Sequence, residues 1–246
     1  TIPMSIIDTL LRNPDLIDRI GKAEEQHQIQ RLYALNHNTP WNQHISDFLT
    51  YGATFNIGTL PLFNQFGPKL DVVKWIDGQV TLYRAPGDII SFDFGGCVMA
   101  RFLLKGSCYA AHIHNAEKIC MQKDRRIDWA QFVKQQQIRD ITMFQPGAEQ
   151  FRRNGPGRGV AIWGIITASQ QCYSVYVKDV AGVSATQGEY RISGIVHYPE
   201  TGKSADFYKP ILDLPDDASF DVVSHVWNAF WKYQQDAYEV LYSADV

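Results

Sequence analysis

The residues best able to do chemistry lie close together near the middle of the chain. Cys97 follows the glycine pair Gly95-Gly96, and His112 and His114 come fifteen and seventeen residues after it. A thiol attacks a carbonyl carbon as its thiolate, and an adjacent imidazole can supply the thiolate by taking the proton. These residue types predict thiol catalysis, with Cys97 as the nucleophile and a histidine as its base.

The two glycines before Cys97 suit a second requirement of this chemistry. Attack on a carbonyl creates an oxyanion, which needs hydrogen-bond donors close to the sulfur. Gly95 and Gly96 have no side chains, so their backbone can bend and present N–H groups there. We therefore predict that this glycine pair supplies the oxyanion-hole backbone.

The choice of base depends on a hairpin turn that is predicted at Lys105-Gly106. A two-residue turn would place Cys97 opposite His114, with His112 on the diagonal. Both histidines share one face because side chains alternate along a strand, and both positions are within reach of the thiol. A bulge or a shifted turn would bring His112 directly across instead, so the pattern alone leaves the base open.

A third group usually orients the imidazole of such a pair. The local candidates are Ser91, Asp93 and a backbone carbonyl. The competing interpretation is that Cys97 is a small core residue, because a cysteine in an apolar strand is usually a packing residue.

The chain has four cysteines, and none of them forms a Cys-x-x-Cys pair. A chain of this length does not need a disulfide framework, and free thiols fit a protein that works in a reducing cytosol. Cys108 shares the strand face of His112 and is a rival nucleophile, although no glycine pair precedes it. Cys120 and Cys172 are interpreted as packing residues.

The elements that position these residues predict an α+β fold with central mixed or antiparallel β-sheets, sandwich-like, flanked by N- and C-terminal helices. Residues 1–246 are expected to form a single domain. It divides into a helical N-terminal cap at 1–45, a strand-rich core at 50–200 and a C-terminal helix at 216–244.

Three local signals support this division. Asp77-Gly78 lies between apolar runs and predicts a β-hairpin. Residues 124–140 have the spacing of an amphipathic helix. The C-terminal helix is expected to begin at Asp216 or Asp217 and to bury an aromatic stripe that includes Trp227 and Trp231 in the core.

Composition restricts the classes of partner. The 246 residues carry a net charge of -3, which argues against a nucleic-acid partner. No apolar run approaches the roughly 20 residues that span a bilayer, and no signal peptide is visible. We expect no cofactor.

The segment around Cys97 resembles the catalytic core of the cytotoxic necrotizing factor family and Burkholderia lethal factor. Phe94-Gly95-Gly96-Cys97 is similar to their Leu-Ser-Gly-Cys motif, with Phe94 and Gly95 departing from it, and His112 has the family spacing from the cysteine. Ala111-His112-Ile113 is similar to the histidine strand of the chemoreceptor deamidase CheD. Ser91 stands six residues before Cys97, where CheD and the lethal factor carry a threonine. The resemblance covers about 25 residues.

This resemblance implies an activity and a set of roles. The family hydrolyses a glutamine carboxamide to glutamate in a target protein. It implies that Cys97 is the nucleophile, that His112 rather than His114 is the base, and that Ser91 orients the imidazole. It also implies a bacterial toxin or effector, secreted or injected, that acts on a protein carrying a reactive glutamine in the cytosol of a target cell.

Two other functions compete with this one. Gly106, His112, His114 and Glu117 resemble the first motif of the cupin family, in which two histidines and a glutamate bind iron or manganese. Glu117 comes one or two residues early for that motif, and no second motif supplies the remaining histidine. Alternatively, the strand core with its tryptophan-rich C-terminus could be a non-catalytic interaction module.

Overall fold

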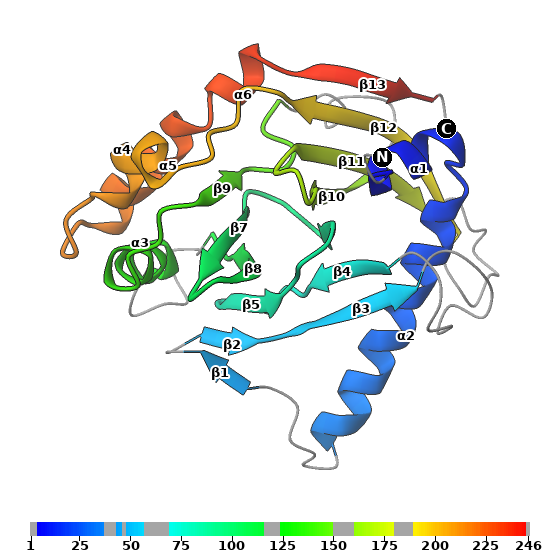
Figure 1. Cartoon of the computed structure of the whole chain (residues 1–246), viewed down its shortest axis with the longest axis horizontal. Coiled ribbons are helices and arrows are strands. Elements are labelled where there is room, and N and C mark those ends of the chain that lie inside the picture. Colours follow the sequence, from blue (N-terminus) through cyan, green and yellow to red (C-terminus); the bar gives the residue numbers. More distant parts are fainter. Residues whose placement is uncertain are drawn as a thin grey trace.

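The computed structural model describes seven stretches of the chain: residues 4–36, 43–45, 48–56, 69–115, 124–149, 160–179 and 189–244. These form two β-sheets packed face to face, with helices on both outer sides (Figure 1). Both sheets are mixed, because β2 runs parallel to β5 in one sheet and β4 runs parallel to β6 in the other. The predicted α+β sandwich with flanking helices is confirmed.

One sheet has seven strands in the order β13-β12-β11-β10-β6-β4-β3. Its central strands are apolar on both faces, as expected for strands that are covered on both sides. The strands are β3 (Gly52–Asn56), β4 (Lys69–Val73), β6 (Ile89–Ser91), β10 (Val160–Ile166), β11 (Cys172–Asp179), β12 (Tyr190–Tyr198) and β13 (Glu239–Ser243).

The other sheet has six strands in the order β1-β2-β5-β8-β7-β9. The strand that carries both histidines of interest, β8, lies between β5 and β7. The strands are β1 (Gln43–Ile45), β2 (Phe48–Thr50), β5 (Val80–Arg84), β7 (Val98–Leu104), β8 (Ser107–Ile113) and β9 (Ile141–Phe144).

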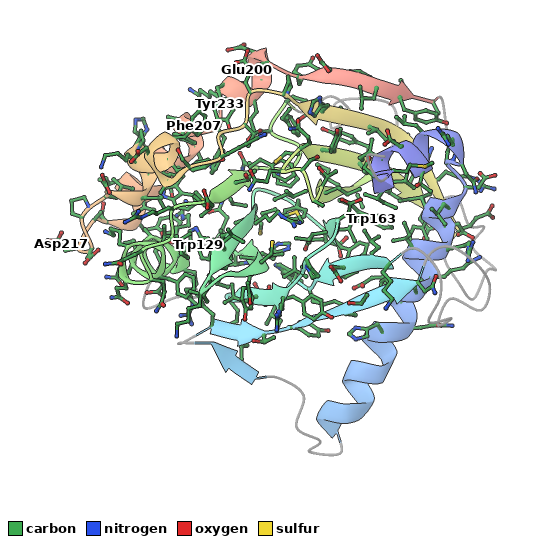
Figure 2. The ribbon with its side chains drawn as sticks, in the orientation of Figure 1. Trp129, Trp163, Glu200, Phe207, Asp217 and Tyr233 are labelled. Atoms are coloured by element: carbon green, nitrogen blue, oxygen red, sulfur yellow. The ribbon has the colours of Figure 1, made fainter. Side chains whose placement is uncertain are left out.

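Helices cover the outer face of each sheet. The seven-stranded sheet packs against α1 (Ile6–Arg12) and α2 (Leu16–Asn36), and Trp163 belongs to this outer cluster. The six-stranded sheet packs against the remaining helices through a second outer cluster that includes Trp129, and Figure 2 shows these two tryptophans on opposite sides of the sandwich. Those helices are α3 (Arg125–Gln135), the short 3-10 helix η1 (Ala205–Tyr208), α4 (Lys209–Leu212), α5 (Phe220–Phe230) and α6 (Tyr233–Asp236).

A third apolar cluster fills the space between the two sheets. It takes residues from both, including Ile89 of β6 and Met99 of β7, and it contains Cys97. Alternation along β7 sends Cys97 and Met99 into this interior and Val98 to the opposite face, under the helices. The candidate nucleophile therefore points toward the middle of the sandwich.

The predicted hairpin at Lys105-Gly106 is confirmed. Both residues have positive φ, 49° and 78°, as a two-residue turn of type I′ requires. The resulting register pairs Met99 with His112 and Val98 with Ile113. Continued by one residue, it brings Cys97 opposite His114 and leaves His112 on the diagonal, without a bulge.

The hairpin predicted at Asp77-Gly78 is wrong. A turn does form there, with Gly78 at φ 71°, but the strands on either side of it belong to different sheets. β4 pairs with β3 and β6, whereas β5 pairs with β2 and β8. The turn therefore carries the chain across the sandwich, because turn chemistry sets the local bend and not the sheet that the next strand joins.

A continuous C-terminal helix at 216–244 is also wrong. The Ser219 side chain, rather than Asp216 or Asp217, accepts the capping hydrogen bond of α5, from the N–H of Val222. The segment then breaks at Trp231, forms the single turn α6 and ends as β13, which pairs with β12. The stripe of buried hydrophobic side chains ends with Trp231, and the edge of the sheet offers Glu239–Ser243 unpaired backbone groups instead.

Two other helical predictions need smaller corrections. The N-terminal cap predicted at 1–45 is helical as far as Asn36, but Gln43–Ile45 is a strand. The helix predicted at 124–140 is capped by Asp124 and ends at Gln135, after which Gln137 adopts a φ of 52°. Among the helices that the structure describes, none combines the length and hydrophobicity needed to cross a membrane.

Candidate active site

Ser91 and His112 meet in the interior of the sandwich. Ser91 ends β6 of the seven-stranded sheet, and His112 lies on β8 of the six-stranded sheet, so the contact joins the two sheets. The Ser91 hydroxyl lies 2.7 Å from Nδ1 of His112, and the two residues are 0% and 1% exposed. The structure thus brings the predicted base and its predicted orienting group into direct hydrogen-bond contact.

The partners of Ser91 determine where the imidazole carries its proton. The Ser91 hydroxyl lies 2.7 Å from the carbonyl oxygen of Val73, which can only accept a hydrogen bond. The single hydroxyl proton is therefore donated to Val73, and the Ser91 oxygen must accept from His112. Nδ1 of His112 carries the proton, and Nε2 keeps its lone pair.

Nε2 of His112 is buried and has no hydrogen-bond partner among the described residues. The ring stacks on Phe94, with centroids 4.3 Å apart and planes 8° from parallel. Burial, together with a smaller effect of the nearby His114, lowers the pKa of His112 to about 3. The imidazole is therefore neutral at physiological pH and presents an unoccupied proton acceptor.

Cys97 lies one residue before β7 and is 7% exposed. Burial raises the pKa of its thiol, and the backbone N–H groups of Asn115, Cys97 and Gly95 oppose this by stabilising the thiolate. No hydrogen bond joins the thiol to Nε2 of His112. Cys97 and His112 are diagonal neighbours on the inner face of one sheet, a separation that long side chains can bridge.

The glycine pair has two different roles. Gly96 has a φ of 125°, and a Cβ there would lie 3.2 Å from Nδ2 of Asn115, so the position requires glycine. Its carbonyl accepts a hydrogen bond of 3.1 Å from Nε2 of Gln145. Gly95 is exposed, and a Cβ there would meet nothing within 4 Å. Gly95 contributes its N–H near the sulfur, whereas Gly96 shapes the bend.

Asn115 is a site residue that sequence reasoning missed. Its N–H makes the largest favourable contribution to the Cys97 thiolate, and its side chain lies beside Gly96. Its position in the sequence could have indicated this role, because Asn115 directly follows His114, the residue predicted to lie opposite the nucleophile. The donors beside the sulfur therefore come from both strands of the hairpin.

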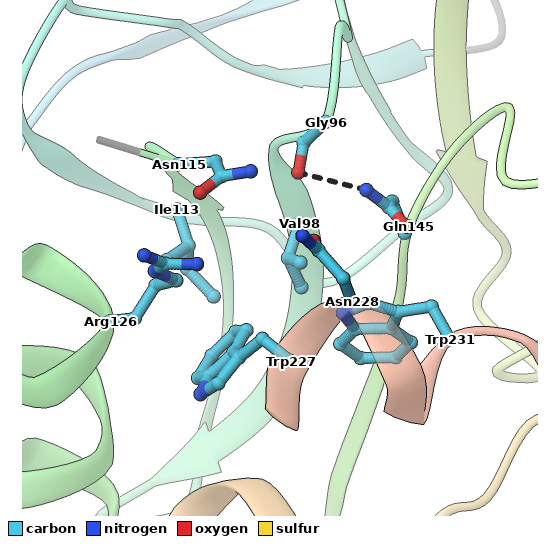
Figure 3. A pocket seen from close by; sticks show the side chains of 9 residues that line it. All are labelled: Gly96, Val98, Ile113, Asn115, Arg126, Gln145, Trp227, Asn228 and Trp231. Atoms are coloured by element: carbon cyan, nitrogen blue, oxygen red, sulfur yellow. Dashed lines mark hydrogen bonds between the residues drawn. The ribbon is translucent and has the colours of Figure 1, made fainter. Parts of the chain in front are cut away.

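A small pocket lies beside the Gly96 backbone, on the face of the six-stranded sheet opposite to the Cys97 side chain (Figure 3). The side chains of Asn115 and Gln145 flank it, and Trp227 and Trp231 of the C-terminal segment form part of its wall. Both tryptophans are 2% exposed, which confirms that they belong to the core. The pocket places polar carboxamides next to the chain that carries the nucleophile.

The other candidate residues make different contacts. Nε2 of His114 is 3.5 Å from the exposed carboxylate of Asp77. Asp93 is exposed with a φ of 60°, while the orienting contact is made by Ser91. Cys108 is partly exposed on β8, two positions after the turn glycine Gly106.

The packing and metal interpretations are affected differently. Cys172 is buried between the sheets, in agreement with the packing role, and burial raises the pKa of its thiol. Cys120 and Glu117 lie outside the described residues. Within the part of the chain that the structure describes, no three His, Cys, Asp or Glu side chains are placed to hold a metal ion. Nδ1 of His112, which a metal site could have used as a ligand atom, is hydrogen-bonded to Ser91.

No family model, no curated protein and no solved structure matches this chain. Any function assigned to the site therefore depends on its geometry and on the local resemblance around Cys97.

Replacing Ser91 with alanine should destabilise the fold by about 1–3 kcal/mol, because the buried Nδ1–H of His112 loses its acceptor. The matched control is Ser193→Ala, which removes one 3.3 Å hydrogen bond to the Tyr176 carbonyl elsewhere in the sandwich and should cost less. The free energy of unfolding is measured by chemical denaturation. Equal costs for the two variants would contradict the special role of Ser91.

The two glycines should respond differently to the same substitution. Gly96→Ala should lower the free energy of unfolding by about 1–3 kcal/mol, because its backbone conformation strains any residue with a Cβ. Gly95→Ala should change it by less than about 0.5 kcal/mol. Thermal unfolding of both variants tests this, and similar melting temperatures would show that the bend does not depend on Gly96.

The pH dependence of Cys97 alkylation should show a neutral thiol and a neutral imidazole. A thiol whose pKa is raised holds less thiolate at every pH below that value, so the rate with iodoacetamide should still rise above pH 9. Rates are measured by mass spectrometry of the Cys97 peptide. A plateau between pH 5 and 8 would indicate a preformed thiolate–imidazolium pair and would contradict the account.

Proposed function

We propose that this protein is a cysteine-dependent protein glutamine deamidase, with Cys97 as nucleophile, His112 as general base and Ser91 as the orienting group. The observation that carries the proposal is the hydrogen-bond chain from His112 through Ser91 to the Val73 carbonyl. It leaves a buried, unpartnered Nε2 on the sheet face that also carries Cys97. A buried acceptor without a partner is costly, which favours a functional role for it.

The chemistry proceeds through an acyl-enzyme. Nε2 of His112 takes the thiol proton as Sγ of Cys97 attacks the carboxamide carbon of a glutamine side chain. The N–H groups of Asn115, Cys97 and Gly95 stabilise the resulting oxyanion. The tetrahedral intermediate expels ammonia, which takes its proton from His112, and a thioester remains.

Hydrolysis of the thioester completes the cycle. A water molecule loses its proton to Nε2 of His112 as its oxygen attacks the thioester carbon. The C–S bond then breaks, the sulfur regains the proton, and glutamate is released. Ser91 holds the ring in one tautomer throughout, because only the Nε2 lone pair can serve both half-reactions.

The resting pair is neutral, and the low pKa of the imidazole makes it a weak base, so transfer of the thiol proton relies on the groups that stabilise the charges formed. Because the pKa of His112 is about 3, the base stays unprotonated well below neutral pH. Because burial raises the pKa of Cys97, the thiolate forms only as the proton is transferred. The N–H groups near the sulfur then stabilise negative charge that passes to the oxyanion.

The biological setting follows from the same resemblance. The substrate is a protein with a reactive glutamine, and the protein acts as a bacterial toxin or effector that is secreted or injected into a target cell. The three free cysteines of the described chain are compatible with a reducing cytosol as the place of action.

Incubation with eukaryotic and bacterial lysates tests the proposal. We expect a Gln-to-Glu conversion, detected by mass spectrometry, that is abolished in Cys97→Ser and reduced about 10²–10⁴-fold in His112→Ala. Cys108→Ser should retain activity, because Cys108 has no part in the mechanism.

The circular dichroism spectrum of each variant provides the folding control. Conversion that persists in Cys97→Ser, or its absence from every lysate, would contradict the deamidase assignment. In the second case, a Cys97 that resists alkylation even above pH 9 would favour a non-catalytic interaction module.

A further inference from the structure

A groove continues from the small pocket beside Gly96 along the helical side of the molecule. The pocket and the groove share Gln145 and Asn228, so they adjoin one another. The groove is bounded on one side by the loop Gln145–Ala148, which follows β9, and on the other by Lys232, which precedes α6, and Gln235 within α6. The end of the groove that meets the pocket, here called its inner end, therefore lies near Gly96, the residue before Cys97 in the chain.

The lining of the groove is rich in carboxamides. Asn228 and Gln235 are exposed and able to donate and accept hydrogen bonds. Gln145 uses Nε2 to hold the Gly96 carbonyl, and its backbone N–H donates to the buried Gln234. Its position is thus fixed. Carboxamides that both donate and accept are suited to the alternating N–H and C=O groups of an extended peptide.

The charges along the groove differ between its two ends. In the small pocket at the inner end, the guanidinium of Arg126 is 2% exposed and lies 2.7 Å from the Asp124 carboxylate, which neutralises it. At the outer end Lys232 is exposed, and the structure records no ion pair for it among the described residues. The outer end is positive, and it favours a negatively charged group on whatever occupies the groove.

We propose that this groove binds an extended segment of the target polypeptide beside the reactive glutamine, and that Lys232 pairs with an aspartate or glutamate of that segment. The inference rests on the proposed function, since it has the target segment pass around the Gly96 bend, from the sheet face that carries Val98 to the face that carries the Cys97 thiol. Gln145, Asn228 and Gln235 hydrogen-bond to the main chain of the target segment. The substrate class is therefore a glutamine in an extended, acidic sequence context.

Binding of synthetic peptides to full-length Cys97→Ser tests the groove without requiring turnover. The probes are fluorescein-labelled glutamine peptides that differ only in carrying glutamate, glutamine or lysine at flanking positions. We expect the glutamate peptides to bind about 3–5-fold more tightly than the neutral ones, the size typical of an exposed ion pair. The preference should decrease at high salt.

Two charge reversals identify the contact. Lys232→Glu in the Cys97→Ser background should remove the preference for glutamate and favour lysine peptides. Lys69→Glu makes the same change in net charge at an exposed position on β4, in the other sheet, and should leave the preference intact. Equal effects of the two reversals, or no preference in the parent, would overturn the inference.

Turnover separates this inference from the proposed function. The wild-type protein is incubated with the same peptides, and ammonia release is measured against Cys97→Ser. Cys97-dependent release without a Lys232-dependent preference would overturn the groove and support the deamidase. A Lys232-dependent binding preference without any release from peptides or lysates would support the groove and overturn the deamidase.

Discussion

The arrangement of the site depends on one hydrogen bond between the two sheets. Ser91 and His112 belong to different sheets, so the bond exists only when the sandwich is packed. The Val73 carbonyl fixes the direction of the bond by taking the hydroxyl proton of Ser91. As a result, a buried imidazole presents Nε2 as an acceptor instead of as a donor.

The packing around this bond keeps the site dry and closely fitted. Phe94 covers one face of the His112 ring, and Gly164 of β10 leaves room for Phe94 and Met99. A Cβ at Gly164 would lie 3.0 Å from the Phe94 ring and 3.1 Å from the Met99 sulfur. Burial then explains why the thiol and the imidazole are both neutral at rest. It also strengthens the effect of the backbone N–H groups beside Cys97, because hydrogen bonds are stronger in a medium of low dielectric constant.

Local signals in the sequence predicted the parts of the site that local structure determines. The turn at Lys105-Gly106 and strand alternation were enough to give the register that relates Cys97 to His112 and His114. The contact between Ser91 and His112 could not be derived in this way, because it depends on how two sheets pack, and only the family spacing indicated it. The same limit explains the incorrect hairpin at Asp77-Gly78 and the incorrect helix at 216–244, since sheet membership is decided by long-range pairing. The groove at Gln145 and Lys232 is likewise built from segments far apart in sequence.

The most direct test of the central claim is the tautomer of His112, measured by ¹⁵N NMR of protein labelled at histidine nitrogens, with assignment from a His112→Gln spectrum. The account predicts that His112 carries its proton on Nδ1, that Nε2 is unprotonated, and that this state persists from pH 8 down to about pH 4. A proton on Nε2, or a ring that titrates near pH 6.5, would contradict it.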